Sequence, residues 1–325
     1  LYIALFPQLI AGPIVCYPDI HDQLLHRRHD LQSFFDGICR FCMGLGKKVL
    51  IADTMAASAN MIMALGPAQL STPYAWLGIV CYAYQIYFDF SGYSDMAIGL
   101  GKMMGFHFLE NFNRPYISQN ITEFWRRWHM SLSRFMRDYL YIPLGGNRVP
   151  PLCVYRNLCL VFLLSGLWHG AAWTFVFWGL YHGIFLIIDR LFWLQFSRRL
   201  GRTLNTGLTF VVVLFGWVLF CSESSAEALS YITRMLDFYH YWQVPQYVPR
   251  GMVMHNYSLF VFVVASLICF VPSLSRYQDL VQATGERITG VQMAWLKFVG
   301  SMACLVLTAL TLSTTNYTPF IYFRF

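Results

Sequence analysis

The stretch NLCLVFLLSGLWHGAAWTFVFWGLYHGIFLII, residues 157–188, decides the fold class. It runs for 32 residues without a charged side chain, whereas one membrane-spanning helix needs about 20 predominantly apolar residues. It is therefore too long for a single helix perpendicular to the bilayer. We expect either two segments broken near Ser165 and Gly166 or one long tilted helix. Both alternatives make the chain a helical membrane protein.

Other apolar runs extend this pattern along the chain. The runs that predict further spanning helices are residues 74–100, 207–220, 257–271 and 291–312. Residues 34–65 are less apolar and contain Arg40 and the pair Lys47–Lys48, so a short span, a re-entrant segment and an interfacial helix remain open there. Since there is no internal repeat or low-complexity linker, we expect one polytopic all-α membrane domain over residues 1–325.

Composition agrees with membrane residence. Hydrophobic residues make up 57% of the chain and charged residues only 12%, against about 25% charged residues in soluble proteins. The net charge of +7 comes from basic residues beside apolar runs. Lipid head groups and cytoplasmic loops explain that excess better than nucleic acid does.

Charge also predicts an orientation. Basic residues crowd the connection after residue 188, opposed only by Asp189, so this connection is expected to be cytoplasmic. They are Arg190, Arg198, Arg199 and Arg202. The more acidic connection over residues 221–256 would then be extracytoplasmic. The chain starts at Leu1 inside the apolar stretch LYIALFPQLIAGPIV, without the basic start of a signal peptide. We interpret it as an N-terminally truncated piece of a membrane protein.

Metal sites and disulfides are not indicated. The nine cysteines are odd in number, and several lie in apolar runs as small hydrophobic residues. Cys39 and Cys42 have no second pair to complete a zinc site. The acidic and histidine residues between Asp19 and Asp30 fix no geometry, and a polar interfacial loop explains them.

The segment 106–151 is polar, aromatic and basic, and it carries the most informative motifs. Residues 121–140 have helical composition, with Asn120 or Thr122 as a cap and Glu123 in the first turn. At about 100° per residue, Arg127, Arg134 and Arg137 share one side of this helix. They fit either an interfacial helix on lipid head groups or a basic mouth for a phosphorylated donor such as coenzyme A.

His169 lies in the middle of the apolar run, beside Trp168 and Gly170. A titratable side chain at membrane depth is costly and suggests a functional site. A neutral histidine bonded to a neighbouring helix is the alternative, and the residues alone leave both open. As a general base, His169 would take the proton from a hydroxyl that attacks a thioester. We interpret His182, nearer the cytoplasmic end, as structural.

Two carboxylates lie in the apolar run at 74–100. Asp89 and Asp95 are expected either to pair with cations or to line a polar cavity. Lys102 shares a helical face with Asp95 but lies two turns away.

Several motifs together resemble the membrane-bound O-acyltransferase family, and within it the alginate-type branch. They are PQLIAGPIV (7–15), YFDFSGYSDMAIG (87–99), NFNRPY (111–116), FWRRWHMSLSRFMRDYLYIPLGGNR (124–148), SGLWHGAAWTFVFWGLYHG (165–183) and the ending PFIYFRF (319–325). The resemblance implies a many-helix fold around a central tunnel, of which the N-terminal helices are missing here. It places the principal catalytic histidine at His169 and the second signature histidine at His129.

The resemblance also implies an activity. The protein would take an acetyl group from a cytoplasmic thioester, with acetyl-CoA favoured over a carrier protein, and would hold no bound cofactor. The acceptor would be an extracytoplasmic polysaccharide, reached directly or through a partner acetyltransferase, at a bacterial inner membrane. Expected substrate-binding residues are Trp125, Arg126, Arg127, Trp128, Trp168 and Asp95.

Two other classes compete with an enzyme. A transporter of a lipid-linked sugar would also carry intramembrane Asp and His residues, but the chain lacks the repeated halves that many transporters show. A non-catalytic scaffold would leave His169 as a packing residue.

Overall fold

The computed structural model describes residues 2, 5–9, 12–66, 69–239, 248–273, 290–314 and 319–320. Within these ranges the ordered elements are helices and no strand occurs, which confirms the all-α class. Residues 10 and 11 of the first motif and residues 321–325 of the last one lie outside the described part of the chain, as do residues 240–247 of the connection expected to be extracytoplasmic.

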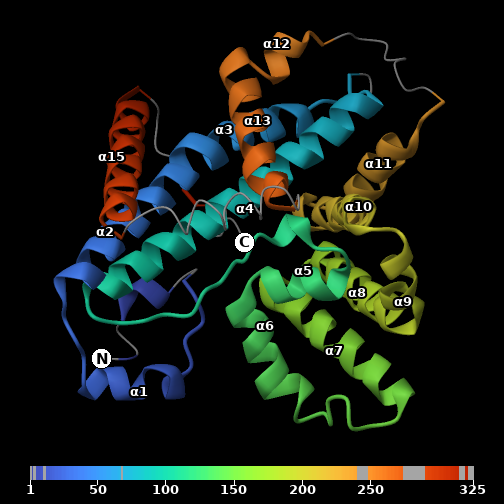
Figure 1. The fold of residues 1–325 in the computed structure, drawn as a ribbon. Coiled ribbons are helices and arrows are strands. Elements are labelled where there is room, and N and C mark those ends of the chain that lie inside the picture. The colour runs from blue at the N-terminus through green and yellow to red at the C-terminus, as the bar shows by residue number, and fades with distance from the viewer. Residues whose placement is uncertain are drawn as a thin grey trace.

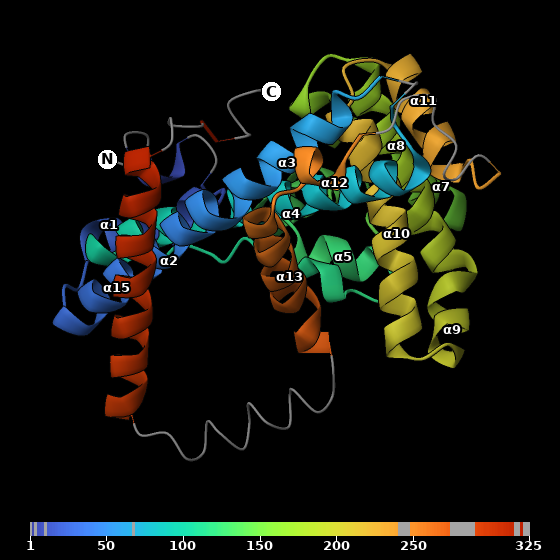
Figure 2. The same ribbon diagram turned by 90° about the horizontal axis from the view of Figure 1, so that it is seen from above.

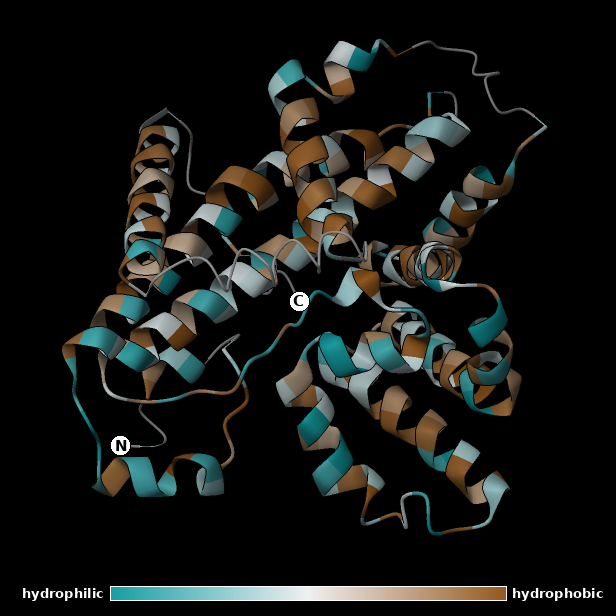
Figure 3. Ribbon diagram, in the orientation of Figure 1, coloured by the Kyte–Doolittle hydropathy of each residue, from teal (hydrophilic) through white to brown (hydrophobic). Residues whose placement is uncertain are grey.

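Helix α4 (Thr72–Met103) crosses the middle of the molecule (Figure 1). It packs against α2 (Leu31–Gly46) and α3 (Asp53–Met63), which continue each other through a π-helical turn over Lys47–Ala52. The stretch 34–65, open in the sequence, is therefore one long helical segment lying along α4. Although α4 matches the run at 74–100, protein surrounds most of its length, and Figure 3 shows polar and apolar residues mixed along it.

Among the described residues, four helical segments are long and apolar enough to cross a membrane, by their length and composition. They are α7 (Pro151–His169), residues Trp173–Arg199, α10 (Arg202–Cys221) and α15 (Gly290–Thr314). Residues Trp173–Arg199 contain α8 (Trp173–Ile188) and α9 (Leu194–Phe196), and α13 (Asn256–Phe270) is a shorter apolar helix. Figure 2 shows α10, α13 and α15 running in similar directions beside the crossing helices.

The remaining helices are shorter. They are α1 (Tyr17–Leu25), α5 (Ile121–Arg127), α6 (Met130–Met136), α11 (Ser225–Leu236) and α12 (Arg250–Val253). The single helix expected over residues 121–140 is wrong, because α5 and α6 are separate helices with a break at Trp128 and His129. A π-helical turn, Arg137–Tyr141, then follows α6.

The run at 157–188 forms two helices, α7 and α8, as one of the two expected alternatives had it. The break lies at residues 170–172 and not at Ser165 and Gly166. Gly166 instead lies inside α7, where a Cβ would overlap the carbonyl oxygen of Phe175. The glycine therefore permits close packing of α7 on α8 and does not end the helix.

Gly179 gives the same contact from the other side, since a Cβ there would overlap the carbonyl oxygen of Phe162. We expect Gly179→Val to prevent α7 and α8 from packing, at a cost of about 1–3 kcal/mol or more. The folded protein recovered from membranes should fall severalfold. Gly207→Val is the matched control, because a Cβ at Gly207 meets no described atom within 4 Å; equal losses in both variants would contradict the packing account.

Candidate active site

The break between α5 and α6 places His129. Its backbone is left-handed, with φ 45° and ψ 53°, a conformation that costs a non-glycine residue about 1–3 kcal/mol. The first backbone N–H groups of α6 lack acceptors within the helix. Asn111 accepts hydrogen bonds from two of these N–H groups. The Met130 amide donates to the Asn111 backbone oxygen at 2.9 Å, and the Ser131 amide donates to Asn111 Oδ1 at 3.3 Å. Local sequence does not show this cap, since Asn111 lies 18 positions before His129.

His129 is buried, with 3% of its surface exposed. Its Nδ1 lies 3.0 Å from Asn111 Oδ1, and its ring meets that of Phe90 edge-on at 4.7 Å between centroids. Its Nε2 has no hydrogen-bond partner within the described residues. His129 lies outside the four candidate spans. Burial lowers the pKa of its imidazole well below the usual value, and the nearby His169 lowers this pKa further. His129 is therefore neutral at physiological pH.

His169 is the last residue of α7 and lies among aromatic rings. The ring centroids of Trp178 and Phe220 are each 5.2 Å from its own, and that of Phe175 is 6.4 Å away. Trp168 lies 5.0 Å from His169 and 6.3 Å from His129, again between centroids. Two histidines 40 positions apart in the sequence thus lie beside one indole.

A cavity of about 450 Å³ opens beside His169. Phe175 and Phe220, whose rings lie next to that of His169, line it together with polar groups of α3, α4, α8 and α11. Its other lining residues include Gln85, Thr174, Ser222, Glu223 and Glu227. This polar cavity thus lies next to the aromatic rings around His169, whereas the partly exposed His169 side chain is not among its lining residues.

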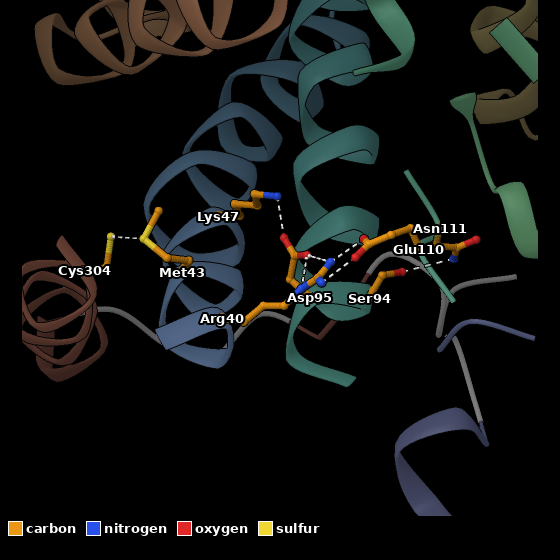
Figure 4. A network of polar contacts seen from close by, with 8 residues as sticks. All are labelled: Arg40, Met43, Lys47, Ser94, Asp95, Glu110, Asn111 and Cys304. Atoms are coloured by element: carbon orange, nitrogen blue, oxygen red, sulfur yellow. Dashed lines mark hydrogen bonds and ion pairs between the residues drawn. The ribbon is translucent and has the colours of Figure 1, made fainter. Parts of the chain in front are cut away.

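A second cavity, of about 280 Å³, is lined in part by Asn111. Asp95 lines it and pairs with Arg40 at 2.8 Å and with Lys47, while Arg40 also binds Glu110 (Figure 4). Asp95 therefore combines the two roles that the sequence left open, and its cations come from α2 and not from Lys102. Deeper in the protein, Asp89 pairs with Lys48 at 2.6 Å.

The expected substrate residues at 125–128 divide between the core and the surface. Trp128 is buried against Trp217, with ring centroids 4.8 Å apart. Arg127 pairs with Glu123 at 2.8 Å. Arg126 and Trp125 line two further cavities, of about 200 and 480 Å³. Only Arg126 and Trp125 of these four residues therefore line a described cavity.

The structure also places the other polar residues considered from sequence. His182 is buried, with 1% exposed, and packs on Trp125 and Trp178. Arg134 binds Asp19 at 2.8 Å and Asp138 at 3.6 Å. These contacts agree with structural roles. Sequence reasoning missed Asn111, although its motif NFNRPY had been singled out.

An all-helical architecture with candidate membrane spans, and a buried and a partly buried histidine beside one indole, fit a membrane acyltransferase. The chain belongs to the membrane-bound O-acyltransferase (MBOAT) family, whose model matches residues 1–225.

Named relatives narrow the comparison. The chain is 42% identical to the probable alginate O-acetylase of Pseudomonas aeruginosa, over its whole length and 70% of that protein. It is 36% identical to the peptidoglycan O-acetyltransferase of Helicobacter pylori, over its whole length and 64% of that relative. It is 31% identical to the teichoic acid D-alanyltransferase of Bacillus subtilis, over 68% of the chain and 60% of that relative.

Proposed function

We propose that the chain is the catalytic part of an O-acetyltransferase of extracytoplasmic polysaccharide. The observation that carries this proposal is the convergence of His129 and His169 on Trp168, with ring centroids 6.3 and 5.0 Å from that indole. Residues that act on one small group must approach it together. A transporter or a scaffold gives no reason for that convergence.

In the proposed reaction an acceptor hydroxyl attacks the thioester carbonyl carbon. The new C–O bond forms and the C–S bond breaks, while a histidine takes the hydroxyl proton and returns it to the leaving thiolate. His169 serves as this base, and His129 orients or polarises the thioester or the acceptor. Since a general base contributes about 10²–10⁴-fold to a rate, both side chains are worth testing singly.

We assign the acceptor and the acetyl donor to different cavities. The cavity next to His169 includes Cys221 and Glu223, at the start of the connection that charge predicts to be extracytoplasmic, and it suits the acceptor. Arg126 lines two cavities on the face of α5 and α6, where Arg134 and Arg137 also lie. An arginine-rich wall suits the phosphates of a donor such as acetyl-CoA.

The acceptor class follows from the relatives' names only as a proposal. Alginate-like exopolysaccharide fits the relatives of greatest identity, and cell-wall glycan fits the next. We place the protein in the bacterial inner membrane, where the acceptor hydroxyl belongs either to the polysaccharide or to a separate extracytoplasmic acetyltransferase that passes the acetyl group on to it. Deleting the gene and measuring ester-linked acetate on each polymer tests this: acetate lost from one polymer and restored by the wild-type gene supports the proposal, and unchanged acetate on all of them contradicts it.

The donor side can be tested at Arg126. Losing one charge-assisted hydrogen bond costs about 1.5–3 kcal/mol, so Arg126→Ala should raise the KM for acetyl-CoA roughly tenfold or more. The kcat should change little. Arg28→Ala is the matched control, since Arg28 is exposed and lies outside these cavities. An unchanged KM in Arg126→Ala would exclude this side as the donor site.

A further inference from the structure

Asn111 lies at the centre of the polar contacts around His129. Its Oδ1 lies 3.0 Å from His129 Nδ1 and accepts from the Ser131 amide at 3.3 Å and from the Ser131 hydroxyl at 2.9 Å. Its Nδ2 donates to the Ser94 hydroxyl at 3.1 Å, as Figure 4 shows. The side chain is buried, with 1% exposed.

These contacts fix which way the amide points. A backbone N–H is always a donor, so the atom of Asn111 that meets the Ser131 amide must be the carbonyl oxygen. An oxygen that faces His129 Nδ1 only accepts, and therefore Nδ1 must carry the hydrogen. In a neutral imidazole the other nitrogen is then unprotonated. The contacts thus leave His129 Nε2 with its lone pair.

That nitrogen is the one without a hydrogen-bond partner within the described residues. A buried polar atom left unpaired costs free energy and calls for an explanation. The ring centroid of Trp168 lies 6.3 Å from that of His129, and His169 directly follows Trp168 in the sequence. The ring that carries the unpaired atom therefore lies in the part of the site where both histidines adjoin Trp168.

We infer that Asn111 is the positioning residue of His129: it holds the ring in the Nδ1–H tautomer and presents the Nε2 lone pair to the reacting groups. This inference rests on the proposed acetyl transfer. It assigns Asn111 two tasks, since the same oxygen also caps α6. The carbonyl of Asn111 thereby couples the strained backbone of His129 to the tautomer of its ring.

The first measurement does not depend on activity. ¹⁵N spectra of histidine-labelled full-length protein, with His129 assigned from the signals that His129→Gln removes, should show protonated Nδ1 and unprotonated Nε2. In Asn111→Ala a substantial share of the ring should move to the opposite tautomer. An Nε2–H ring in the wild-type protein would overturn the inference.

The second measurement separates positioning from simple capping. Asn111→Ala should lower kcat about tenfold or more with KM within about twofold, because the lone pair is misplaced and substrate contacts stay. Asn111→Asp keeps an oxygen for His129 Nδ1 and for Ser131, so it should keep the tautomer and most of kcat. Ser131→Ala removes the hydroxyl that donates to Asn111 Oδ1 and accepts from the Ile14 amide, but it keeps the capping Ser131 amide and the contact of Asn111 with His129. It should therefore keep both.

Each outcome decides. An Asn111→Ala protein that folds with unchanged kcat overturns the inference, as does a folded Asn111→Asp protein that has lost both tautomer and activity. If Asn111→Ala does not fold, the wild-type tautomer and Asn111→Asp still decide. Asn113→Ala, on the same loop and exposed, is the matched control and should behave as wild type. A wild-type protein that transfers no acetyl group would refute the proposed function, while the spectra would still judge the tautomer.

Discussion

His129→Ala and His169→Ala are each expected to abolish most acetyl transfer, and the double variant is expected to be scarcely worse than His169→Ala. The two rings both lie beside Trp168 and serve one transfer in the proposed reaction. Residues that act as one catalytic unit give strongly non-additive losses. Each single loss should reach about 10²–10⁴-fold, the range for general acid–base groups. Acetyl transfer by the purified full-length protein in proteoliposomes measures all three variants.

The protein must stay folded for this comparison to have meaning. Neither histidine makes an ion pair within the described residues, so abundance in the membrane should stay near wild type. His255→Ala is the matched control, since His255 is exposed and only precedes α13. Additive losses, or loss of folded protein with either change, would indicate two independent structural histidines.

Asp89→Ala should destabilise the protein more than any surface change. Asp89 and Lys48 are 2% and 4% exposed, and their ion pair measures 2.6 Å. Lys48 also pairs with Asp53 at 2.8 Å, so Asp89→Ala leaves the buried ammonium with one carboxylate in place of two. Breaking a buried ion pair costs up to about 3–5 kcal/mol, a large part of the usual 5–15 kcal/mol of total stability. Thermal unfolding in detergent and the yield of folded protein should both show the loss.

Two further variants test the cause. Asp89→Leu combined with Lys48→Met removes both buried charges, and Asp53, which is partly exposed, loses its contact with Lys48. Part of the lost stability should return, because replacing buried ion pairs by apolar residues is often neutral. Asp22→Ala, at an exposed carboxylate, should unfold as wild type does. A double variant no more stable than Asp89→Ala would show that the pair matters through other contacts.

The apolar helices could be predicted from sequence because their composition is local information. Residues 157–188 carry it without a charged residue and residues 291–312 with only Lys297, and both regions form long apolar helices. The positions of breaks are not local. The turn after α7 lies at residues 170–172, and Gly166 lies inside the helix, where it allows a close contact with Phe175. The sequence shows that residue 166 is a glycine, but it does not show which residue packs against it.

The site shows the same limit. His169 attracted attention as a polar ring in an apolar run, which needs no knowledge of contacts. The break at His129 depends on Asn111, 18 positions earlier in the chain, which replaces the helical hydrogen bonds of α6. Arg40 and Lys47, the partners of Asp95, come from a different helix. Tertiary partners of this kind decided the roles that composition and periodicity left open.

Transfer of labelled acetate by the full-length protein in proteoliposomes tests the central claim most directly. Acetyl-CoA carrying the label is supplied on one side of the membrane, and the label on acceptor polysaccharide or in released acetate is counted for wild type, His169→Ala and His255→Ala. The account predicts label transfer by wild type and His255→Ala and its loss in His169→Ala. Near-normal transfer by a correctly folded His169→Ala protein would contradict the mechanism.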